Sequence, residues 1–151
     1  MEGRQIVGLK WAREMRKVPV FASTSKPTGA KGKGVSYEKK ISAKLPFCWL
    51  RSKWFEFEDS RGYGICQPDF LLPLSHMVII GECKLTWTAR ALTQLTGLYF
   101  PVVEKALGLN PCGLVICKNL TPKVEGKIFN SLPAAGGELE IGKIVTWHCP
   151  A

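Results

Sequence analysis

Apolar and polar positions along the chain predict several β-strands. Aromatic and acidic residues alternate in part over 47–58, which indicates a strand. Two more strands are expected over 70–74 and 77–84, joined by a short turn. The all-apolar run at 112–117 is typical of a fully buried strand, and a last strand is expected over 144–148.

Residues 35–45 have helical periodicity, and Pro46 closes the segment. Glu38 shares a face with Ile41 and Leu45. Because Ile41 and Leu45 need burial, Glu38 is expected to point inward with them. An inward carboxylate is costly unless it is paired or binds a cation. A glutamate at the rim of the core, capped by a neighbour, is the simpler alternative.

A longer helix is expected over 89–107, with Thr88 as its amino-terminal cap. Pro101 should kink or split this helix, and Gly108 is a typical carboxyl-terminal stop. One short helix or strand is expected near 124–132. The resulting order of helix, three strands, helix and strand is typical of an α/β sandwich around a mixed sheet. A length of 151 residues fits a single domain.

Positive charge is concentrated near the amino terminus. Residues 1–40 contain 10 Lys and Arg against 3 Asp and Glu, whereas residues 41–151 contain 11 against 9, for a formal net charge of +9. Because Gly, Pro, Ser and Thr are frequent before residue 35, residues 1–34 are interpreted as a flexible basic arm and 35–151 as the folded domain. Such an arm suits a polyanionic partner, and a solvated tail is the alternative.

The sequence disfavours several other classes. No apolar stretch is long enough to span a membrane and no signal sequence is evident, so a cytoplasmic location is expected. The six cysteines form no Cys-x-x-Cys pair and are interpreted as reduced thiols, and Cys112, Cys117 and His148 lack the spacing of a zinc site. The run at 29–34 lacks the Gly-Lys-Ser/Thr ending of a phosphate-binding loop.

Two neighbouring predicted strands carry the residues that point to chemistry. Glu82 and Lys84 share one face at the end of a strand, while Cys83 points the other way into the core. A carboxylate and an ammonium group in this arrangement are well placed to face a ligand cleft. Asp69 follows Pro68 at the start of the preceding strand, so pairing of the two strands can bring Asp69 close to Glu82.

Two converging carboxylates form a site for a hard cation such as Mg²⁺, with Mn²⁺ as an alternative. Asp69 and Glu82 are the candidate ligands, joined by the main-chain carbonyl of Cys83, and Glu38 could hold a second metal or its waters. Lys84 would orient or activate a water for phosphodiester hydrolysis. A strand-end salt bridge between Glu82 and Lys84 is the simpler alternative. The inward glutamate, the two strand motifs and the basic arm together favour a nuclease.

These segments resemble the motifs of the PD-(D/E)XK nuclease superfamily over residues 32–118, in the family's order. Within that superfamily the chain is most similar to small archaeal and phage Holliday junction resolvases. The resemblance implies a restriction-endonuclease-like central mixed β-sheet flanked by helices, and a homodimer that cuts four-way DNA junctions. The residues to which it gives catalytic or metal-binding roles are Glu38, Asp69, Glu82, Cys83 and Lys84, with Ser60 in a serine-containing loop as a further catalytic candidate.

The resemblance also implies a basic surface that contacts the DNA backbone without reading its sequence. A phage-encoded protein of this kind would act in the host cytoplasm. The candidate DNA-binding residues are Lys31, Lys33, Lys39 and Arg61.

Two alternatives to a resolvase stay open. The string from Gln94 to Tyr99 resembles the Gln-and-Tyr helix motif of RecB-type exonucleases, with one residue more between the two side chains. Gln94 could contact a metal-bound water or a phosphate, although a solvated helix glutamine is the commoner case. The second alternative is a non-catalytic basic DNA-binding module, against which the intact Asp69, Glu82 and Lys84 argue.

Overall fold

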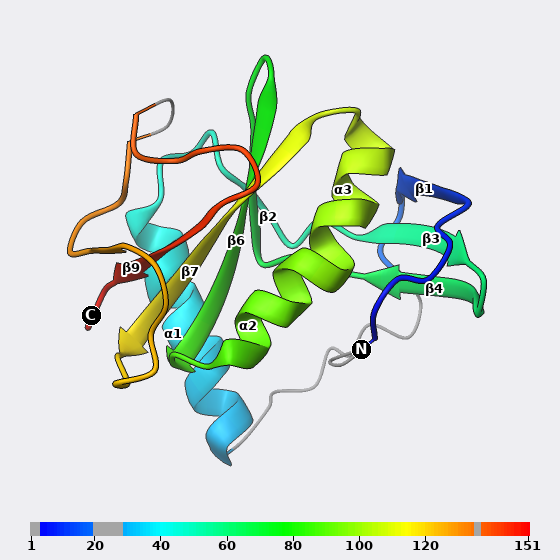
Figure 1. The fold of residues 1–151 in the computed structure, drawn as a ribbon. Coiled ribbons are helices and arrows are strands. Elements are labelled where there is room, and N and C mark those ends of the chain that lie inside the picture. Colours follow the sequence, from blue (N-terminus) through cyan, green and yellow to red (C-terminus); the bar gives the residue numbers. More distant parts are fainter. Residues whose placement is uncertain (1–3, 20–28, 135–136) are drawn as a thin grey trace.

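A six-stranded sheet with helices on both faces forms the centre of the fold (Figure 1). The computed structural model describes residues 4–19, 29–134 and 137–151, and for residues 29–31 the backbone alone. The pairs β2–β5 and β5–β6 are antiparallel and the others parallel, so the sheet is mixed, as expected. Its strands, in spatial order, are β2 (Leu50–Arg51), β5 (Phe70–Pro73), β6 (Met77–Thr86), β7 (Asn110–Asn119), β9 (Ile144–His148) and β8 (Ile128–Phe129).

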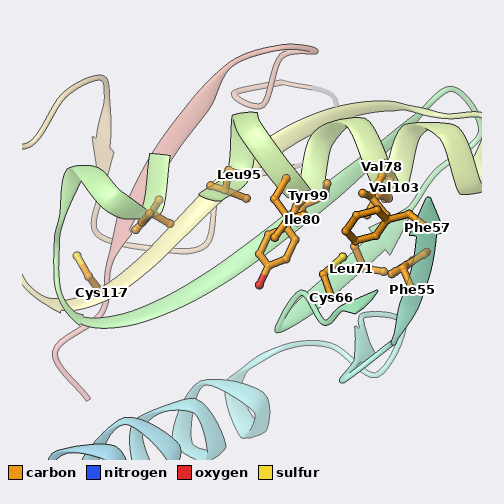
Figure 2. Close-up of a cluster of buried hydrophobic side chains, with 14 of the residues drawn as sticks. Phe55, Phe57, Cys66, Leu71, Val78, Ile80, Leu95, Tyr99, Val103 and Cys117 are labelled. Carbon is orange, nitrogen blue, oxygen red and sulfur yellow. The ribbon is translucent and has the colours of Figure 1, made fainter. Parts of the chain in front are cut away.

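Each face of this sheet has its own apolar core. Helix α1 (Gly29–Lys44) covers one face, where Tyr37, Ile41 and Leu45 are buried. The other face is covered by a helical run of α2 (Ala89–Gln94), a π-helical turn η1 (Leu95–Tyr99) and α3 (Phe100–Leu107). Figure 2 shows this second core, where side chains from η1 and α3 meet those of the strands. The architecture is therefore α/β with helices flanking mixed sheets. No helix among the described residues is long and apolar enough to cross a membrane.

Pro101 explains the change of helical type before α3. Proline has no N–H, so it cannot make the α-helical hydrogen bond to Gly97 four residues earlier. The freed carbonyl of Gly97 accepts a hydrogen bond from the Ile6 N–H at 2.9 Å instead. The helix expected over 89–107 is thus one continuous helical run whose type changes before Pro101, and the freed carbonyl is where the amino-terminal segment is attached. Gly108 ends α3 in the left-handed conformation, with φ of 68°, as expected.

Gly113 lets this helical run approach the sheet closely. A Cβ atom at Gly113 of β7 would lie 3.2 Å from Leu95 Cδ1, 3.2 Å from the Phe100 ring and 2.9 Å from Ile144 Cγ1. Any larger residue would therefore push η1 and the start of α3 away from β7. The small residue thus helps to fix where the side chains of η1 lie over the sheet.

A second, three-stranded antiparallel sheet lies beside α3, in the order β1 (Trp11–Glu14), β3 (Phe55–Asp59) and β4 (Gly62–Cys66). This sheet corrects two expectations. No strand was expected between residues 58 and 70, but β4 covers Gly62–Cys66, after a turn at Ser60 and Arg61. The prediction of a flexible arm over 1–34 is wrong for two described segments. Residues 11–14 form β1, and residues 29–34 belong to α1. Residues 20–28 lie outside the described part of the chain.

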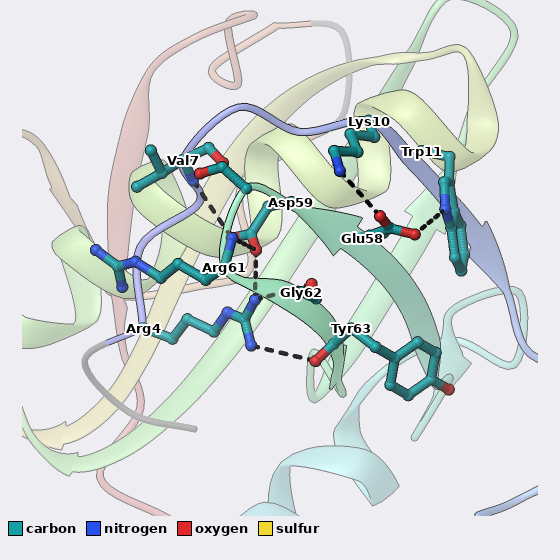
Figure 3. Close-up of polar contacts among 10 residues, drawn as sticks. Arg4, Val7, Lys10, Trp11, Glu58, Asp59, Arg61, Gly62 and Tyr63 are labelled. Carbon is teal, nitrogen blue, oxygen red and sulfur yellow. Dashed lines mark hydrogen bonds and ion pairs between the residues drawn. The ribbon is translucent and has the colours of Figure 1, made fainter.

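An ion pair joins the amino-terminal segment to the β3–β4 turn (Figure 3). Arg4 NH2 donates to Asp59 Oδ1 at 2.6 Å, and the Asp59 side chain is fully buried. The main-chain N–H groups of Val7 and Arg61 also donate to this carboxylate, at 3.4 and 3.0 Å. The guanidinium of Arg4 lies 4.9 Å from the centre of the Phe57 ring. The carboxylate therefore ties the amino-terminal segment to the β3–β4 turn.

We expect Asp59→Asn to lower the melting temperature by about 6–12 °C, because the change leaves the Arg4 guanidinium, only 18% exposed, without its counter-charge. Glu58→Gln is the matched control, since Glu58 pairs with Lys10 on the exposed side of the same strand. Thermal unfolding followed by circular dichroism measures both. Equal shifts in the two variants would contradict a special role for the buried pair.

Candidate functional site

Glu82 and Lys84 lie where β6 emerges from the core, as the sequence predicted. All residues from Met77 to Glu82 are buried, and the strand becomes half-buried from Cys83 onward. Glu82 is only 5% exposed, and its Oε2 atom has no hydrogen-bond partner among the described residues. A buried carboxylate oxygen without a partner is costly, so this atom is suited to a ligand that neutralises it.

Asp69 is brought beside Glu82 by strand pairing. It directly precedes β5, and Phe70 of β5 pairs with Gly81 of β6, so Asp69 falls opposite Glu82. Its Oδ2 atom accepts a hydrogen bond from the Cys83 N–H at 2.9 Å. The carboxyl groups of Asp69 and Glu82 are close enough for each to affect the pKa of the other. The expected proximity of these two residues is therefore present.

Glu38 adds a third carboxyl group from α1. Its side chain is half-buried and close enough to Asp69 to affect the pKa of both groups, in agreement with the inward face predicted from Ile41 and Leu45. The chain thus gathers acidic groups from three elements: α1, the start of β5 and the end of β6. Lys84 is close enough to Glu82 to favour its charged form.

Burial raises the pKa of all three carboxyl groups, and the contacts among them shift these values further in both directions. Loss of solvation is the largest cause in each case. It raises the pKa of Glu38 to about 8, with a further contribution from Asp69. The pKa of Asp69 rises to about 7, with Glu82 as the next cause, and that of Glu82 rises to about 7 although Lys84 opposes the shift. A divalent cation that bound to these carboxyl groups would displace their protons.

The metal-free protein should therefore lose stability as the pH rises. A raised pKa means that the folded state binds the proton more tightly than the unfolded chain does. The resulting stabilisation is complete below the unfolded pKa of about 4 and is lost as the pH passes the folded values of about 7 to 8. We expect the melting temperature in EDTA to fall between pH 5 and 8.5, and Mg²⁺ to reduce that fall. Identical pH profiles with EDTA and with Mg²⁺ would contradict cation binding here.

The π-helical turn brings Gln94 and Tyr99 together near Glu82. Gln94 Nε2 donates to the Tyr99 hydroxyl at 2.9 Å, and Gln94 Oε1 is buried without a hydrogen-bond partner among the described residues. The interpretation of Gln94 as a solvated helix glutamine is therefore wrong. Tyr99 Oη also donates to the Gln67 carbonyl at 3.2 Å, and Tyr99 is close enough to Glu82 for each group to affect the pKa of the other. A π-turn closes between residues i and i+5, so it accommodates the additional residue between Gln94 and Tyr99.

Sequence reasoning gave Tyr99 no role, because its string has one residue too many for the motif it resembles. The signal that could have revealed the role is the pairing of Gly97 with Pro101 four residues later. Such a pair breaks the regular α-helical hydrogen-bond pattern at this place. A local change of helical pitch was therefore predictable, although its type was not.

Other candidate residues lie elsewhere. Ser60 is exposed in the β3–β4 turn, where its hydroxyl donates to the Val7 carbonyl at 2.6 Å, and Arg61 follows it. This turn is at the opposite end of the hairpin from Cys66. Cys66 is close enough to Glu82 for the charge of Glu82 to raise the pKa of its thiol. The structure therefore does not bring Ser60 or Arg61 to the carboxyl groups. Lys33 and Lys39 are exposed on α1, and the side chain of Lys31 lies outside the described residues.

The donor set fits a hard cation, with one restriction. Among the described residues, no group of three or more His, Cys, Asp or Glu side chains is arranged to hold a metal ion. A cation at Asp69 and Glu82 would therefore complete its coordination with water, substrate phosphate or main-chain oxygen, which is the usual behaviour of Mg²⁺. The main-chain carbonyl of Cys83 was the predicted metal ligand. The contact that the structure shows for Cys83 is the hydrogen bond from its N–H to Asp69. The cysteine thiol faces the α1 side of the sheet.

Comparison with known proteins adds no relative. No protein-family model matches the chain. A search of curated proteins likewise finds no match. The functional argument therefore depends on the site itself.

Proposed function

We propose that this chain is a Mg²⁺-dependent DNA endonuclease of the PD-(D/E)XK type with a restriction-endonuclease-like fold. The observation that carries the proposal is the convergence of Glu38, Asp69 and Glu82 from three elements, with Lys84 beside them. A salt bridge at a strand end needs only one carboxylate and one lysine. Three buried carboxyl groups, each with a pKa raised mainly by loss of solvation, destabilise the metal-free fold when they ionise, and a cation-binding role accounts for their presence.

Asp69 and Glu82 would hold the Mg²⁺, and Mn²⁺ could replace it. When bound, the cation lowers the pKa of a water molecule and offsets charge on the phosphate. Glu38 would accept a hydrogen bond from a metal-bound water and so orient it. Lys84 would orient the attacking water and neutralise charge on the phosphate oxygens. Hydrolysis adds the water oxygen to phosphorus as the ester bond to the leaving oxygen breaks, which produces one phosphate end and one hydroxyl end.

We infer that the substrate is branched DNA, resolved at four-way junctions by a homodimer. The resemblance of the motifs to small Holliday junction resolvases supports this choice, as does the net charge of +9 on a chain of 151 residues. The DNA backbone would meet exposed basic residues around the site, such as Lys39.

A second candidate is an exonuclease or another DNA repair nuclease. The contact between Gln94 and Tyr99 at Glu82 favours it, because the π-turn brings the two side chains together as a Gln-and-Tyr helix motif would. Such a pair would hold Glu82 in position in either enzyme. The pair therefore supports a nuclease site, and its likeness to the exonuclease motif is the reason to test for end-dependent cutting.

Products from a panel of DNA substrates distinguish these candidates. Labelled four-way junction, linear duplex, single-stranded DNA and flap DNA are incubated with the full chain and Mg²⁺ or EDTA. Paired symmetric cuts in the junction, absent in EDTA, are expected for the resolvase. Progressive shortening of linear DNA would favour the exonuclease instead. Tight junction binding without any cleavage would indicate a non-catalytic DNA-binding module.

A further inference from the structure

Helix α1 presents a stripe of lysines on the flank away from Glu38. Lys33, Lys40 and Lys44 are all exposed, and they lie about 120–160° around the helix axis from Glu38. We call these three residues the lysine stripe. Along the axis it extends about 16 Å, which corresponds to about five nucleotides of one DNA strand. No ion pair within the described part of the chain involves any of the three.

An exposed aromatic residue, Phe47, follows the last lysine of the stripe in the chain. Phe47 is 96% exposed, which makes it the most exposed large hydrophobic residue in the described part of the chain. It lies in a turn over residues 46–49, directly after α1, where the Trp49 N–H donates to the Pro46 carbonyl at 3.1 Å. A phenylalanine at this position contributes almost no apolar burial to folding. Its exposure therefore points to a partner.

The turn that carries Phe47 is firmly fixed. Trp49 is buried, and Arg51 donates to the carbonyls of Ser42, Leu45 and Trp49 at 2.8, 3.1 and 2.5 Å. Arg51 thereby satisfies main-chain acceptors at the end of α1 and clamps the turn to the helix. An exposed ring on a clamped turn loses little conformational entropy on binding, which favours a contact role.

The same turn is directly connected to the carboxyl cluster. It leads into β2, where Arg51 pairs with Phe70 of β5, and the next residue, Ser52, donates its N–H to the Asp69 carbonyl at 3.2 Å. Phe47, the lysine stripe and Asp69 therefore belong to one rigid part of the fold. A ligand that reaches around the end of α1 could contact all three.

We propose that the lysine stripe and Phe47 form a second nucleic-acid surface, which binds one arm of a branched DNA while another arm occupies the carboxyl cluster. The lysines contact the phosphates of the arm, and an unpaired base at the branch stacks on Phe47. This inference rests on the proposed function and deepens it by naming the feature of the DNA that is recognised. A linear duplex can occupy only one of the two flanks of α1, whereas a branched molecule can occupy both.

Charge and chemistry favour nucleic acid over a protein partner. Glu38 is the only acidic residue of α1, and it lies on the other flank, so the exposed stripe carries one sign of charge. Protein surfaces usually mix both signs, and a row of like charges repels a second copy of the same helix. An exposed aromatic residue that follows a row of exposed lysines in the chain is a combination that can bind bases and phosphates.

Salt dependence of binding tests the lysine stripe. The full chain with Asp69→Asn, which leaves the DNA intact, is titrated with fluorescent four-way junction and blunt duplex at several salt concentrations, and anisotropy gives the dissociation constants. Adding K33Q, K40Q and K44Q should reduce the slope of log K against log salt by about 3 on the junction and by less than about 1 on the duplex. The control adds K105Q, K123Q and K143Q, which remove three exposed charges elsewhere. Equal slopes for the two triple variants would overturn the proposal.

A forked duplex tests Phe47. Phe47→Ala in the same background should weaken binding of the fork about tenfold and binding of the blunt duplex less than about twofold, and Phe47→Trp should preserve both. Ile141→Ala, at another exposed apolar residue, is the control and should change neither. Equal weakening of fork and duplex would overturn the stacking role. A change in molecular mass by light scattering for Phe47→Ala alone would also overturn it, and would assign Phe47 to contact with a second copy.

Failure of this inference can be told apart from failure of the proposed function, because the binding measurements need no cleavage. If the lysine-stripe and Phe47 variants bind branched DNA more weakly as expected, but the wild-type chain never cuts DNA, the proposed binding surface is supported and the nuclease proposal fails. If the wild-type chain cuts junctions and the variants bind them normally, the surface alone is wrong.

Discussion

Asp69→Asn should reduce Mg²⁺-dependent DNA cleavage by about 10³-fold while making the metal-free protein more stable. The asparagine amide oxygen can still accept the hydrogen bond from the Cys83 N–H, so the local fold is preserved. The substitution removes a negative charge beside Glu82 and Glu38, whose pKa values are already raised. At pH 8 in EDTA we expect a gain of about 1–3 kcal/mol in unfolding free energy.

Opposite changes in activity and stability are the signature of a metal-binding carboxylate. A residue needed only for packing would lower both when it is replaced. Glu104→Gln is the matched control, because Glu104 is an exposed carboxylate on α3 and should alter neither property. Chemical denaturation in EDTA gives the stability, and initial cleavage rates in Mg²⁺ give the activity. An Asp69→Asn protein that cleaves as fast as the wild type would remove Asp69 from the site.

Lys84→Met should lower kcat by about 10²–10⁴-fold and leave cation binding nearly unchanged. Methionine keeps the length and apolar stem of lysine, so the half-buried position stays filled. The lost ammonium group would have oriented the attacking water and offset phosphate charge. Its removal also takes away an influence that lowers the pKa of Glu82, so Mg²⁺ should bind at slightly higher pH than in the wild type.

Calorimetric titration with Mg²⁺ and single-turnover cleavage separate the two roles of Lys84. Lys105→Met, at an exposed lysine on α3, is the control and should leave both measurements unaltered. A Lys84→Met protein that cleaves normally would assign Lys84 to a structural ion pair with Glu82. One that loses Mg²⁺ binding as well as cleavage would show that the lysine acts by organising the carboxyl groups.

Much of the central sheet was predictable, because four of its strands coincide with apolar runs in the sequence. Strands β5, β6, β7 and β9 lie where these runs predicted them, and the two-residue side-chain period correctly placed Glu82 and Lys84 on one face. The convergence of Asp69 on Glu82 followed from the short turn between β5 and β6. These features depend on local pattern and on one hairpin, which a single sequence shows directly.

The elements that were missed depend on tertiary contacts. Strand β1, Trp-Ala-Arg-Glu, has no apolar run and exists because it pairs with β3. Strand β4 contains Gly62 and Gly64, which weaken its intrinsic preference, and Gly64 lies against the Phe57 ring. Helix α1 begins at Gly29, through a glycine- and lysine-rich stretch that predicted a flexible segment. In each case pairing or packing decides what local propensity does not.

The residues of the candidate site also fall into those that local pattern located and those that depend on tertiary contacts. Glu38, Glu82 and Lys84 were located from the side-chain period of their own elements, and Asp69 from the pairing of β5 with β6. The contact of Gln94 with Tyr99 was not, because it depends on the π-turn and on the proline that releases a helical carbonyl. Ser60 was transferred through a loop, and loops give no periodicity from which a position can be checked.

The central claim is that the carboxyl cluster binds a divalent cation and uses it to hydrolyse DNA. The most direct measurement is cleavage of a labelled four-way junction by the full wild-type chain in Mg²⁺, after removal of the metal with EDTA, and again after Mg²⁺ is restored. The account predicts cuts that disappear with EDTA and return with Mg²⁺. Cleavage that continues in EDTA, or no cleavage of any DNA in Mg²⁺ or Mn²⁺ by folded protein, would contradict it.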